Sequence, residues 1–213
     1  MTFDFPGVTL SSTAEFVLLQ SDRPLFMLSS AIVGGGLLTA SRIINRHVDK
    51  NYRGGDPVAD QTAFAQAHGV QPPFAGLMTA VNLDKTRTAT RREGDLTVSA
   101  VVTAGVGNAT CAGVSAPMAP RPGTINIIVL VDGNLTPAAL VNAVITTTEV
   151  KTHTLLERGV KTPDGIAATG TSTDAVVIAC TGKGAPLPYA GPLTLVGSLI
   201  GQCVRACMQE ALA

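Results

Sequence analysis

The stretch GLMTAVNLDKTRTATRREGDLTVSAVVTAGVGN, residues 76–108, decides the fold class of this 213-residue chain. Its two arms alternate as β-strands do, and Glu93-Gly94-Asp95 between them forms a turn. Charged side chains recur along the first arm, whereas the second arm is largely apolar. The pattern predicts a β-hairpin with one polar strand and one more buried strand.

Short apolar runs bounded by Asp, Ser and Pro precede the hairpin and predict strands at 15–20, 24–31 and 34–48. The last run alternates loosely, so a helix fits it almost as well. A loop is expected over 49–60 and a helix over 61–69. The N-terminal half is therefore rich in strands.

Two strands alternate with two long helices after the hairpin. Thr136 is suited to an N-cap, Pro137 to the first helical position and Gly159 to the end of a helix. The near-continuous apolar character of the first strand indicates cover on both faces. The expected elements are a strand at 123–133, a helix at 135–160, a strand at 174–180 and a helix at 191–213.

This order of elements predicts an α+β fold rather than a doubly wound sheet. We expect a mixed, largely antiparallel β-sheet covered by the two long helices of the C-terminal half. The length suits a single domain over residues 1–213, with a sizeable core.

Charge and cysteine content exclude several classes of protein. Fifteen basic and fifteen acidic residues give no net charge, and no basic run points to nucleic acid. No apolar stretch reaches the roughly 18 residues of a membrane helix, and no signal-peptide pattern is present. The four cysteines show no CxxC spacing, which favours reduced thiols and a cytoplasmic location. Charged residues make up only 14% of the chain, against about 25% typically, which favours a homo-oligomer or a large apolar ligand site.

Common catalytic motifs are missing from the chain. It contains no GxSxG, no HExxH and no phosphate-binding glycine loop. A three-histidine zinc site would need every histidine of the chain, so no metal site is expected.

The densest polar cluster is TGTSTDAVVIAC, residues 169–180. Thr171, Ser172 and Thr173 directly precede Asp174, and an apolar strand follows. A carboxylate at a strand end acts as a general base when burial tunes its pKa. Alternatively, Asp174 caps a turn whose hydroxyls bond the local backbone, and composition alone slightly favours this turn.

Seven blocks of sequence together resemble the adenosylcobinamide amidohydrolase family, CbiZ, over roughly residues 25 to 210. The resemblance implies an enzyme of corrinoid salvage that hydrolyses the amide between a corrin side chain and its aminopropanol arm, or that of unwanted cobamides, giving adenosylcobyric acid. The cobalt-containing corrinoid is then the substrate, and no further cofactor is expected. The blocks are LSSAIVGGG (28–36), HVDKNY (47–52), GVGNAT (105–110), GTINI (123–127), LTPAALVNAVITTTEVKT (135–152), TGTSTDA (169–175) and YAGPLTLVG (189–197).

Hydrolysis of an amide requires a nucleophile, proton transfer and donors for the oxyanion. We assign Asp174 and Glu149 as the acid–base pair, with Thr171, Ser172 or Thr173 as nucleophile or water-positioning group. At 100° per residue, Glu149 shares a polar stripe with Asn142, Thr146 and His153. The same stripe also fits the solvated face of an amphipathic helix.

The remaining candidates are expected to bind substrate. Because a corrin ring is rimmed with amides, Asn and Thr side chains suit its site. Thr124 and Thr171 each follow a glycine, as a self-cleaving N-terminal-threonine hydrolase requires, although the continuous 213-residue chain argues against that route. Two alternatives stay open: a non-catalytic corrinoid-binding protein, and a hydrolase of another cyclic or peptide-like amide. The substrate-binding candidates are Asn108, Asn126, Thr124, His47, Tyr52 and Tyr189.

Overall fold

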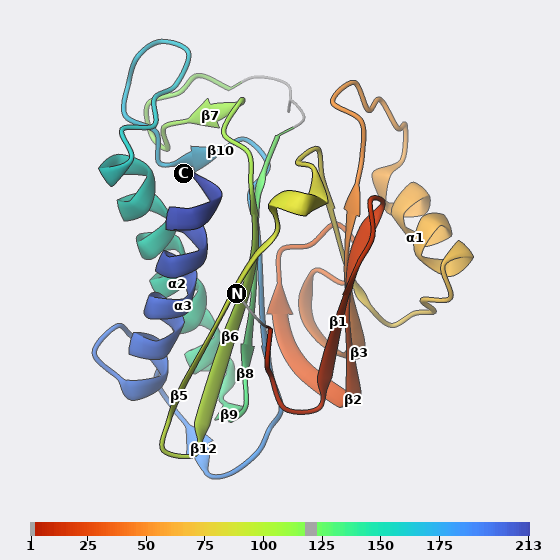
Figure 1. The fold of residues 1–213 in the computed structure, drawn as a ribbon, viewed down its shortest axis with the longest axis vertical. Coiled ribbons are helices and arrows are strands. Elements are labelled where there is room, and N and C mark those ends of the chain that lie inside the picture. The colour runs from red at the N-terminus through yellow and green to blue at the C-terminus, as the bar shows by residue number, and fades with distance from the viewer. Residues whose placement is uncertain (1–2, 118–122) are drawn as a thin grey trace.

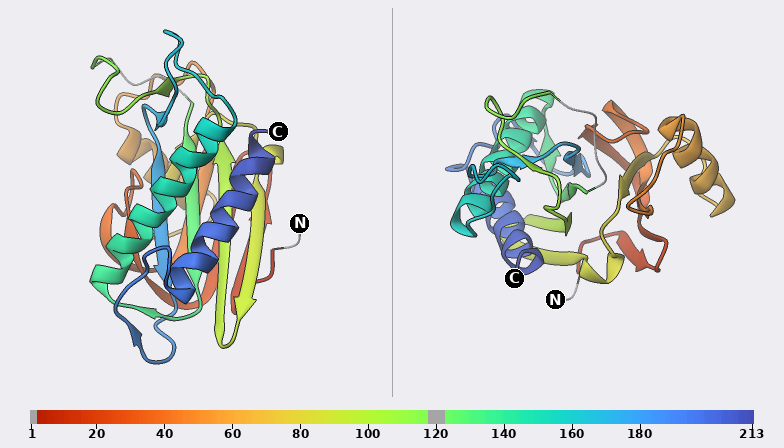
Figure 2. Two further views of the ribbon diagram at one scale, coloured as in Figure 1. Left: turned by 90° about the vertical axis from the view of Figure 1, so that its left-hand side faces the viewer. Right: turned by 90° about the horizontal axis from the view of Figure 1, so that it is seen from above.

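The α+β prediction is confirmed by a computed structural model, which describes residues 3–117 and 123–213. One mixed sheet forms the centre of the molecule (Figure 1). The long helices α2 (Pro137–Glu157) and α3 (Leu195–Ala211) lie side by side across one face of it, as the left view of Figure 2 shows. A shorter helix, α1 (Pro57–Ala67), packs beside the edge strand β4.

The strand order of the sheet is β4-β3-β2-β11-β8-β6-β5, with β1 paired to β2. The β11–β8 and β3–β4 pairs are parallel, and the other pairs of this sheet are antiparallel. Two small ladders, β7–β10 and β9–β12, lie outside it. The strands are β1 (Val8–Ser12), β2 (Phe16–Ser29), β3 (Gly36–His47), β4 (Ala75–Thr79), β5 (Arg87–Glu93), β6 (Leu96–Ala104), β7 (Ala109–Thr110), β8 (Ile125–Val131), β9 (Asn134–Leu135), β10 (Gly170–Thr171), β11 (Ala175–Cys180) and β12 (Pro186–Leu187).

The hairpin turns where expected, but its first arm is shorter than predicted. Glu93 pairs with Leu96 across Gly94, whose φ of 55° suits glycine. Residues 76–79 belong instead to β4, at the other end of the strand order, and a 3₁₀ turn (Leu83–Lys85) separates them from β5. Alternation alone does not distinguish one edge strand from another.

Two other boundaries refine the expectations. Within the range 34–48, residues Gly36–His47 form the strand β3 and not a helix. Helix α1 begins four residues before the expected position 61, because Asp56 accepts hydrogen bonds from the backbone N–H groups of Val58 and Ala59, and Pro57 takes the first helical position. Helix α2 begins as predicted, with Thr136 as N-cap.

The sheet curls, so that its inner face encloses a second core. In β8, Ile125, Ile127 and Val129 face the helices, whereas Ile128 and Leu130 face inward. Strand β4, at one end of the strand order, comes over central β8, where the Met78 carbonyl accepts a hydrogen bond from Asn126. The view from above in Figure 2 shows this curvature. The parallel strands β8 and β11 begin at the same end of the curl, and the site lies there.

No helix in the described ranges is both long and apolar enough to cross a membrane.

Candidate active site

A cavity of about 520 Å³ lies at the end of the curled sheet where β8 and β11 begin. Ile32, Val48, Leu77 and Ala80 contribute apolar walls. A volume of this order is typical of small-molecule sites, in which a few placed polar groups fix orientation. The polar side chains that line it belong to Ser30, Tyr52, Thr79, Thr124, Asn126, Thr173 and Asp174.

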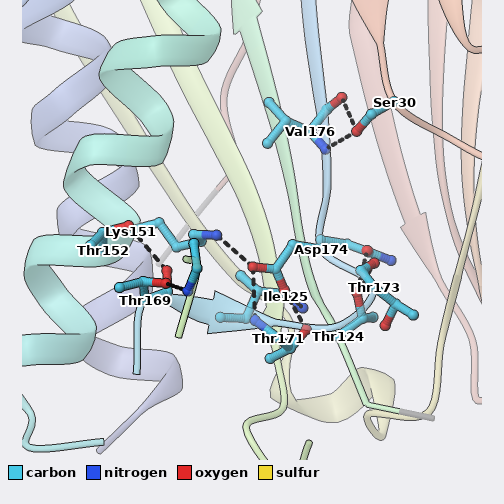
Figure 3. A network of polar contacts seen from close by, with 12 residues as sticks. Ser30, Thr124, Ile125, Lys151, Thr152, Thr169, Thr171, Thr173, Asp174 and Val176 are labelled. Atoms are coloured by element: carbon cyan, nitrogen blue, oxygen red, sulfur yellow. Dashed lines mark hydrogen bonds and ion pairs between the residues drawn. The ribbon is translucent and has the colours of Figure 1, made fainter. Parts of the chain in front are cut away.

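Asp174 is held by four hydrogen-bond donors (Figure 3). Its Oδ2 accepts from Lys151 Nζ at 2.5 Å and from the Thr171 N–H at 3.1 Å. Its Oδ1 accepts from the Ile125 N–H at 3.1 Å and from the Thr171 hydroxyl. The Lys151 and Asp174 side chains are only 11% and 15% exposed. This geometry makes Asp174 an anchor that ties α2 to the start of β8, because its lone pairs already face donors.

The three hydroxyls before Asp174 have different partners. Thr171 lies in β10 and bonds Asp174, as described, so it secures the anchor. Ser172 Oγ accepts from Asn108 Nδ2 at 2.8 Å. Thr173 Oγ1 donates to the Gly123 carbonyl at 2.7 Å. The turn therefore connects the Asp174 anchor to Asn108 and Gly123.

The Gly123 carbonyl oxygen is the meeting point of two donors. Besides Thr173 Oγ1, Asn108 Nδ2 donates to it at 2.6 Å. Gly123 has a φ of 130°, and a Cβ at this position would lie 2.7 Å from Asn108 Oδ1, so only glycine fits. Two side-chain donors on one carbonyl oxygen form the arrangement of an oxyanion hole.

Thr124 follows Gly123 directly and lines the cavity. Its hydroxyl donates to the Thr173 carbonyl at 2.7 Å and lies 3.2 Å from Asn126 Oδ1. Asn126 Nδ2 in turn donates to Asn45 Oδ1 and to the Met78 carbonyl, each at 2.9 Å. Because its amide nitrogen is committed to two acceptors, Asn126 turns its oxygen toward Thr124. The buried polar chain ends at Thr103, which accepts from Asn45 at 3.1 Å.

Tyr52 reaches the cavity from the loop before α1. Its hydroxyl donates to Asp60 Oδ2 at 2.6 Å, and Arg46 Nη1 lies 3.6 Å from the same oxygen. Partial burial and the bond to Asp60 raise the pKa of Tyr52 to about 12. The same hydrogen bond, as the largest cause, lowers the pKa of Asp60. Tyr52 is therefore a neutral donor at physiological pH.

The comparisons with known proteins identify the family. A family model described as CbiZ, adenosylcobinamide amidohydrolase, matches residues 6–213. The chain belongs to the adenosylcobinamide amidohydrolase family. It is an enzyme, and its activity is that of an adenosylcobinamide amidohydrolase in corrinoid salvage. The resemblance in the sequence is thereby confirmed.

Two relatives carry the same description. An adenosylcobinamide amidohydrolase from Methanosarcina mazei is 33% identical over 181 residues, which are 81% of this chain and 82% of the relative. One from Halobacterium salinarum is 36% identical over 143 residues, which are 64% of this chain and 57% of the relative.

Solved structures share the fold at low identity. The PH0078 protein from Pyrococcus horikoshii OT3 matches with a TM-score of 0.54 and 12% identity, over 96% of this chain and 82% of that one. A β-aminopeptidase from Burkholderia sp. matches with a TM-score of 0.50 and 14% identity, over 97% and 84%. These likenesses support the α+β architecture of the amidohydrolase.

The structure does not bring Glu149 to the cavity of the amidohydrolase. Glu149 is exposed on α2, and it stands two residues, or about 200°, around the helix from Lys151. The proposed Asp174–Glu149 pair is therefore not formed, and Lys151 takes the place of the partner. His153, from the same polar stripe, lies on the surface with its Nδ1 3.3 Å from Glu157 Oε1.

The polar stripe predicts the wrong inward face of α2, because the side chains that pack inward are small and many of them carry hydroxyls. Thr146 and Thr147 are buried, whereas Val141 and Ile145 are 50% and 49% exposed. The missed residue, Lys151, does carry a signal. It stands in helical phase with buried neighbours spaced three or four residues apart, namely Leu140, Ala143, Thr147 and Thr154.

The substrate-binding candidates divide in the same way. Thr124, Asn126 and Tyr52 line the cavity, and Asn108 meets it through Gly123. His47 Nδ1 lies 3.0 Å from the Val81 carbonyl and is outside the cavity lining. Tyr189 is 68% exposed and follows β12, which pairs with β9 beyond the far end of β8, so Tyr189 is remote from the site.

No group of three or more His, Cys, Asp or Glu side chains within residues 3–117 and 123–213 is arranged to hold a metal ion.

Proposed function

We propose that the cavity at the start of β8 and β11 is the place where the corrinoid amide is hydrolysed. The observation that carries this proposal is the arrangement of polar groups around Thr124. There a hydroxyl on the cavity wall stands directly beside two donors, Asn108 Nδ2 and Thr173 Oγ1, that converge on one carbonyl oxygen. A nucleophile next to oxyanion donors is the constellation that acyl transfer needs.

The size of the cavity determines which part of the substrate enters. A volume of about 520 Å³ is too small for a whole corrin macrocycle with its adenosyl group. It suits the aminopropanol arm and its amide, whose short apolar chain would pack on Leu77 and Ala80. The ring then rests over the mouth, beside Ile32, which is 43% exposed. The products are adenosylcobyric acid and the aminopropanol-type fragment, and the corrinoid cobalt arrives with the substrate.

The site candidates take different roles under this proposal. Asp174 and Thr171 position the backbone at the start of β8 through Ile125. Thr173 contributes an oxyanion donor, while Ser172 orients Asn108. Tyr52 and Asn126 offer a hydroxyl and an amide to the arm. We expect no cofactor besides the substrate.

Narrowing the mouth of the cavity tests whether the amide is hydrolysed there. Ile32→Trp should lower kcat/KM for adenosylcobinamide at least about ten-fold, mainly through KM, because it obstructs the arm. Leu37→Trp is the matched control, since Leu37 is 58% exposed and lies outside the cavity lining. Adenosylcobyric acid is measured by mass spectrometry. Equal kcat/KM in both variants would place the reaction elsewhere. Turnover of other amides without turnover of adenosylcobinamide would show that the substrate is a different amide.

We also propose that the chain self-associates. Its charged content is only 14%, and Val141, Ile145 and Leu156 leave apolar surface on α2 about half exposed. Sedimentation equilibrium should show more than one chain per particle. The change Ile145→Lys should shift the particle toward the monomer, and a monomeric parent protein would contradict the proposal.

A further inference from the structure

We propose that the chain cleaves its own Gly123–Thr124 peptide bond, and that Thr124, as the new N-terminal residue, is the nucleophile of the amidohydrolase. This inference rests on the cavity proposed above as the active site. It assigns a modification site and a catalytic residue together, and the argument begins from the Gly123 carbonyl.

The Gly123–Thr124 bond already lies in the position of a substrate. Its carbonyl oxygen receives hydrogen bonds from Asn108 Nδ2 at 2.6 Å and from Thr173 Oγ1 at 2.7 Å. Donors in this position stabilise negative charge on the same oxygen during attack. As long as the bond is intact, the chain itself occupies these donors. Cleavage would make them available to the amide of an incoming substrate.

The attacking group is held next to the carbonyl. The Thr124 hydroxyl is directed to the Thr173 carbonyl at 2.7 Å and to Asn126 Oδ1 at 3.2 Å. On the other side of Thr124, the Ile125 N–H is fixed by Asp174 at 3.1 Å. Thr124 is 3% exposed, so few alternative positions are open to it. The Asp174 anchor and the buried amide chain therefore position the backbone on both sides of this residue.

The reaction balances with one molecule of water. Thr124 Oγ1 attacks the Gly123 carbonyl carbon through a small ring that contains Cβ, Cα and the peptide nitrogen. The C–N bond breaks, the nitrogen takes up the hydroxyl proton, and an ester joins Gly123 to Thr124 Oγ1. Water then hydrolyses the ester. The Gly123 carboxylate is released, and Thr124 retains its hydroxyl and a new α-amino group.

The new amine supplies the base that the cavity otherwise lacks. Among the described residues that line the cavity, Tyr52 and Asp174 are the ionisable ones. The pKa of Tyr52 is about 12, and Asp174 already accepts from four donors. An α-amino group has a pKa of roughly 7.7–8.0, which suits proton transfer from the adjacent hydroxyl. Threonine activated by its own terminal amine is an established type of nucleophile.

The fold would hold the two fragments together after cleavage. Strands β8 and β11, from the second fragment, lie between β2 and β6, from the first. Helices α2 and α3 also belong to the second fragment and cover strands of both. Separation would therefore require disruption of the sheet.

Denaturing mass spectrometry of the purified full chain tests the proposal. We expect fragments 1–123 and 124–213, whose masses together exceed that of the intact chain by one water, and N-terminal sequencing of the second fragment should begin Thr-Ile-Asn-Ile. Thr124→Ala should remain one chain and lose turnover. Thr124→Ser should still cleave and retain activity, which guards against a folding defect in the alanine variant.

Ser198→Ala is the matched control, because Ser198 also follows a glycine but lies on α3, outside the cavity lining. It should still cleave after Gly123. Asn108→Ala and Thr173→Val should each slow cleavage about ten-fold or more, because each removes one donor from the carbonyl. A wild-type chain that remains intact and hydrolyses adenosylcobinamide overturns self-cleavage but leaves the cavity as the active site. If the wild-type chain cleaves itself but Ile32→Trp and Leu37→Trp hydrolyse adenosylcobinamide equally well, the cavity is not the active site.

Discussion

Lys151 Nζ lies 2.5 Å from Asp174 Oδ2, between α2 and the start of β11, and both side chains are largely buried. Removing one member leaves an uncompensated buried group. Asp174→Asn and Lys151→Met should therefore each lower the free energy of unfolding by about 3 kcal/mol or more. The double variant should be less destabilised than the sum of the two, because neither charge is left alone.

Urea unfolding measures this prediction, followed by circular dichroism because the chain has no tryptophan. The Arg23–Asp22 pair provides a control. Both side chains are more than half exposed, at 52% and 58%, and lie 3.1 Å apart, so Arg23→Met should cost less than about 1 kcal/mol. Equal effects of Lys151→Met and Arg23→Met would show that the Asp174 anchor is not structural.

The buried chain of amides should control the rate rather than the affinity. Asn45 is 3% exposed and positions Asn126, but it lies outside the cavity lining. Asn45→Ala should lower kcat about ten-fold with little change in KM, and should cost about 1–3 kcal/mol of stability. Steady-state kinetics and urea unfolding are the measurements. Asn134→Ala, at the opposite end of the sheet, should leave kcat unchanged, and an unaltered kcat in Asn45→Ala would remove it from the positioning network.

Tyr52 makes the stability of the protein sensitive to high pH. Its pKa rises from 10.0 to about 12 in the folded chain, first because of burial and then because of Asp60. The neutral phenol is therefore favoured by folding. This contribution is fully present below pH 10 and is lost as the pH rises toward about 12.

An absorbance titration of tyrosinate in Tyr189→Phe isolates this group, because the chain has two tyrosines. The midpoint is expected near 12, and Asp60→Asn should move it toward 10.0. A midpoint at 10.0 without that substitution would show that the bond between Tyr52 and Asp60 is not formed.

Glu149 should be dispensable. It is exposed on α2 and has no hydrogen bond or ion pair with any residue that the structure describes. Glu149→Gln should change kcat and KM less than about two-fold, as is usual for surface positions. A loss of turnover comparable to that of Thr124→Ala would restore Glu149 to the reaction.

Much of the fold follows from local patterns. The apolar runs of β8 and β11 and the Thr136-Pro137 start of α2 are explicit in the sequence, and the structure confirms all three. The sequence pattern places strand β4 wrongly, because its pairing with β3 depends on the curl of the sheet, a long-range property. The alternation of residues 76–79 fits a place in the hairpin arm and a pairing with β3 equally well.

The site was predictable only in part. The sequence predicts a functional edge at residues 169–175 and pairs Asp174 with Glu149, whereas the structure pairs Asp174 with Lys151, on another side of α2. The Gly123 carbonyl could not be recognised from the sequence, because a backbone oxygen has no residue-type signature. Its two donors, Asn108 and Thr173, come together only in the folded chain, 15 and 50 residues from it in sequence.

The interleaved order β2-β11-β8-β6 has a practical consequence. Each strand contributed by residues 124–213 to the large sheet has a neighbour from the N-terminal part, so the two parts are complementary templates for each other. Genes encoding them separately should yield polypeptides that assemble in the same cell into one particle. The amidohydrolase would then serve as a split reporter, in which corrinoid turnover registers the meeting of two proteins fused to the halves.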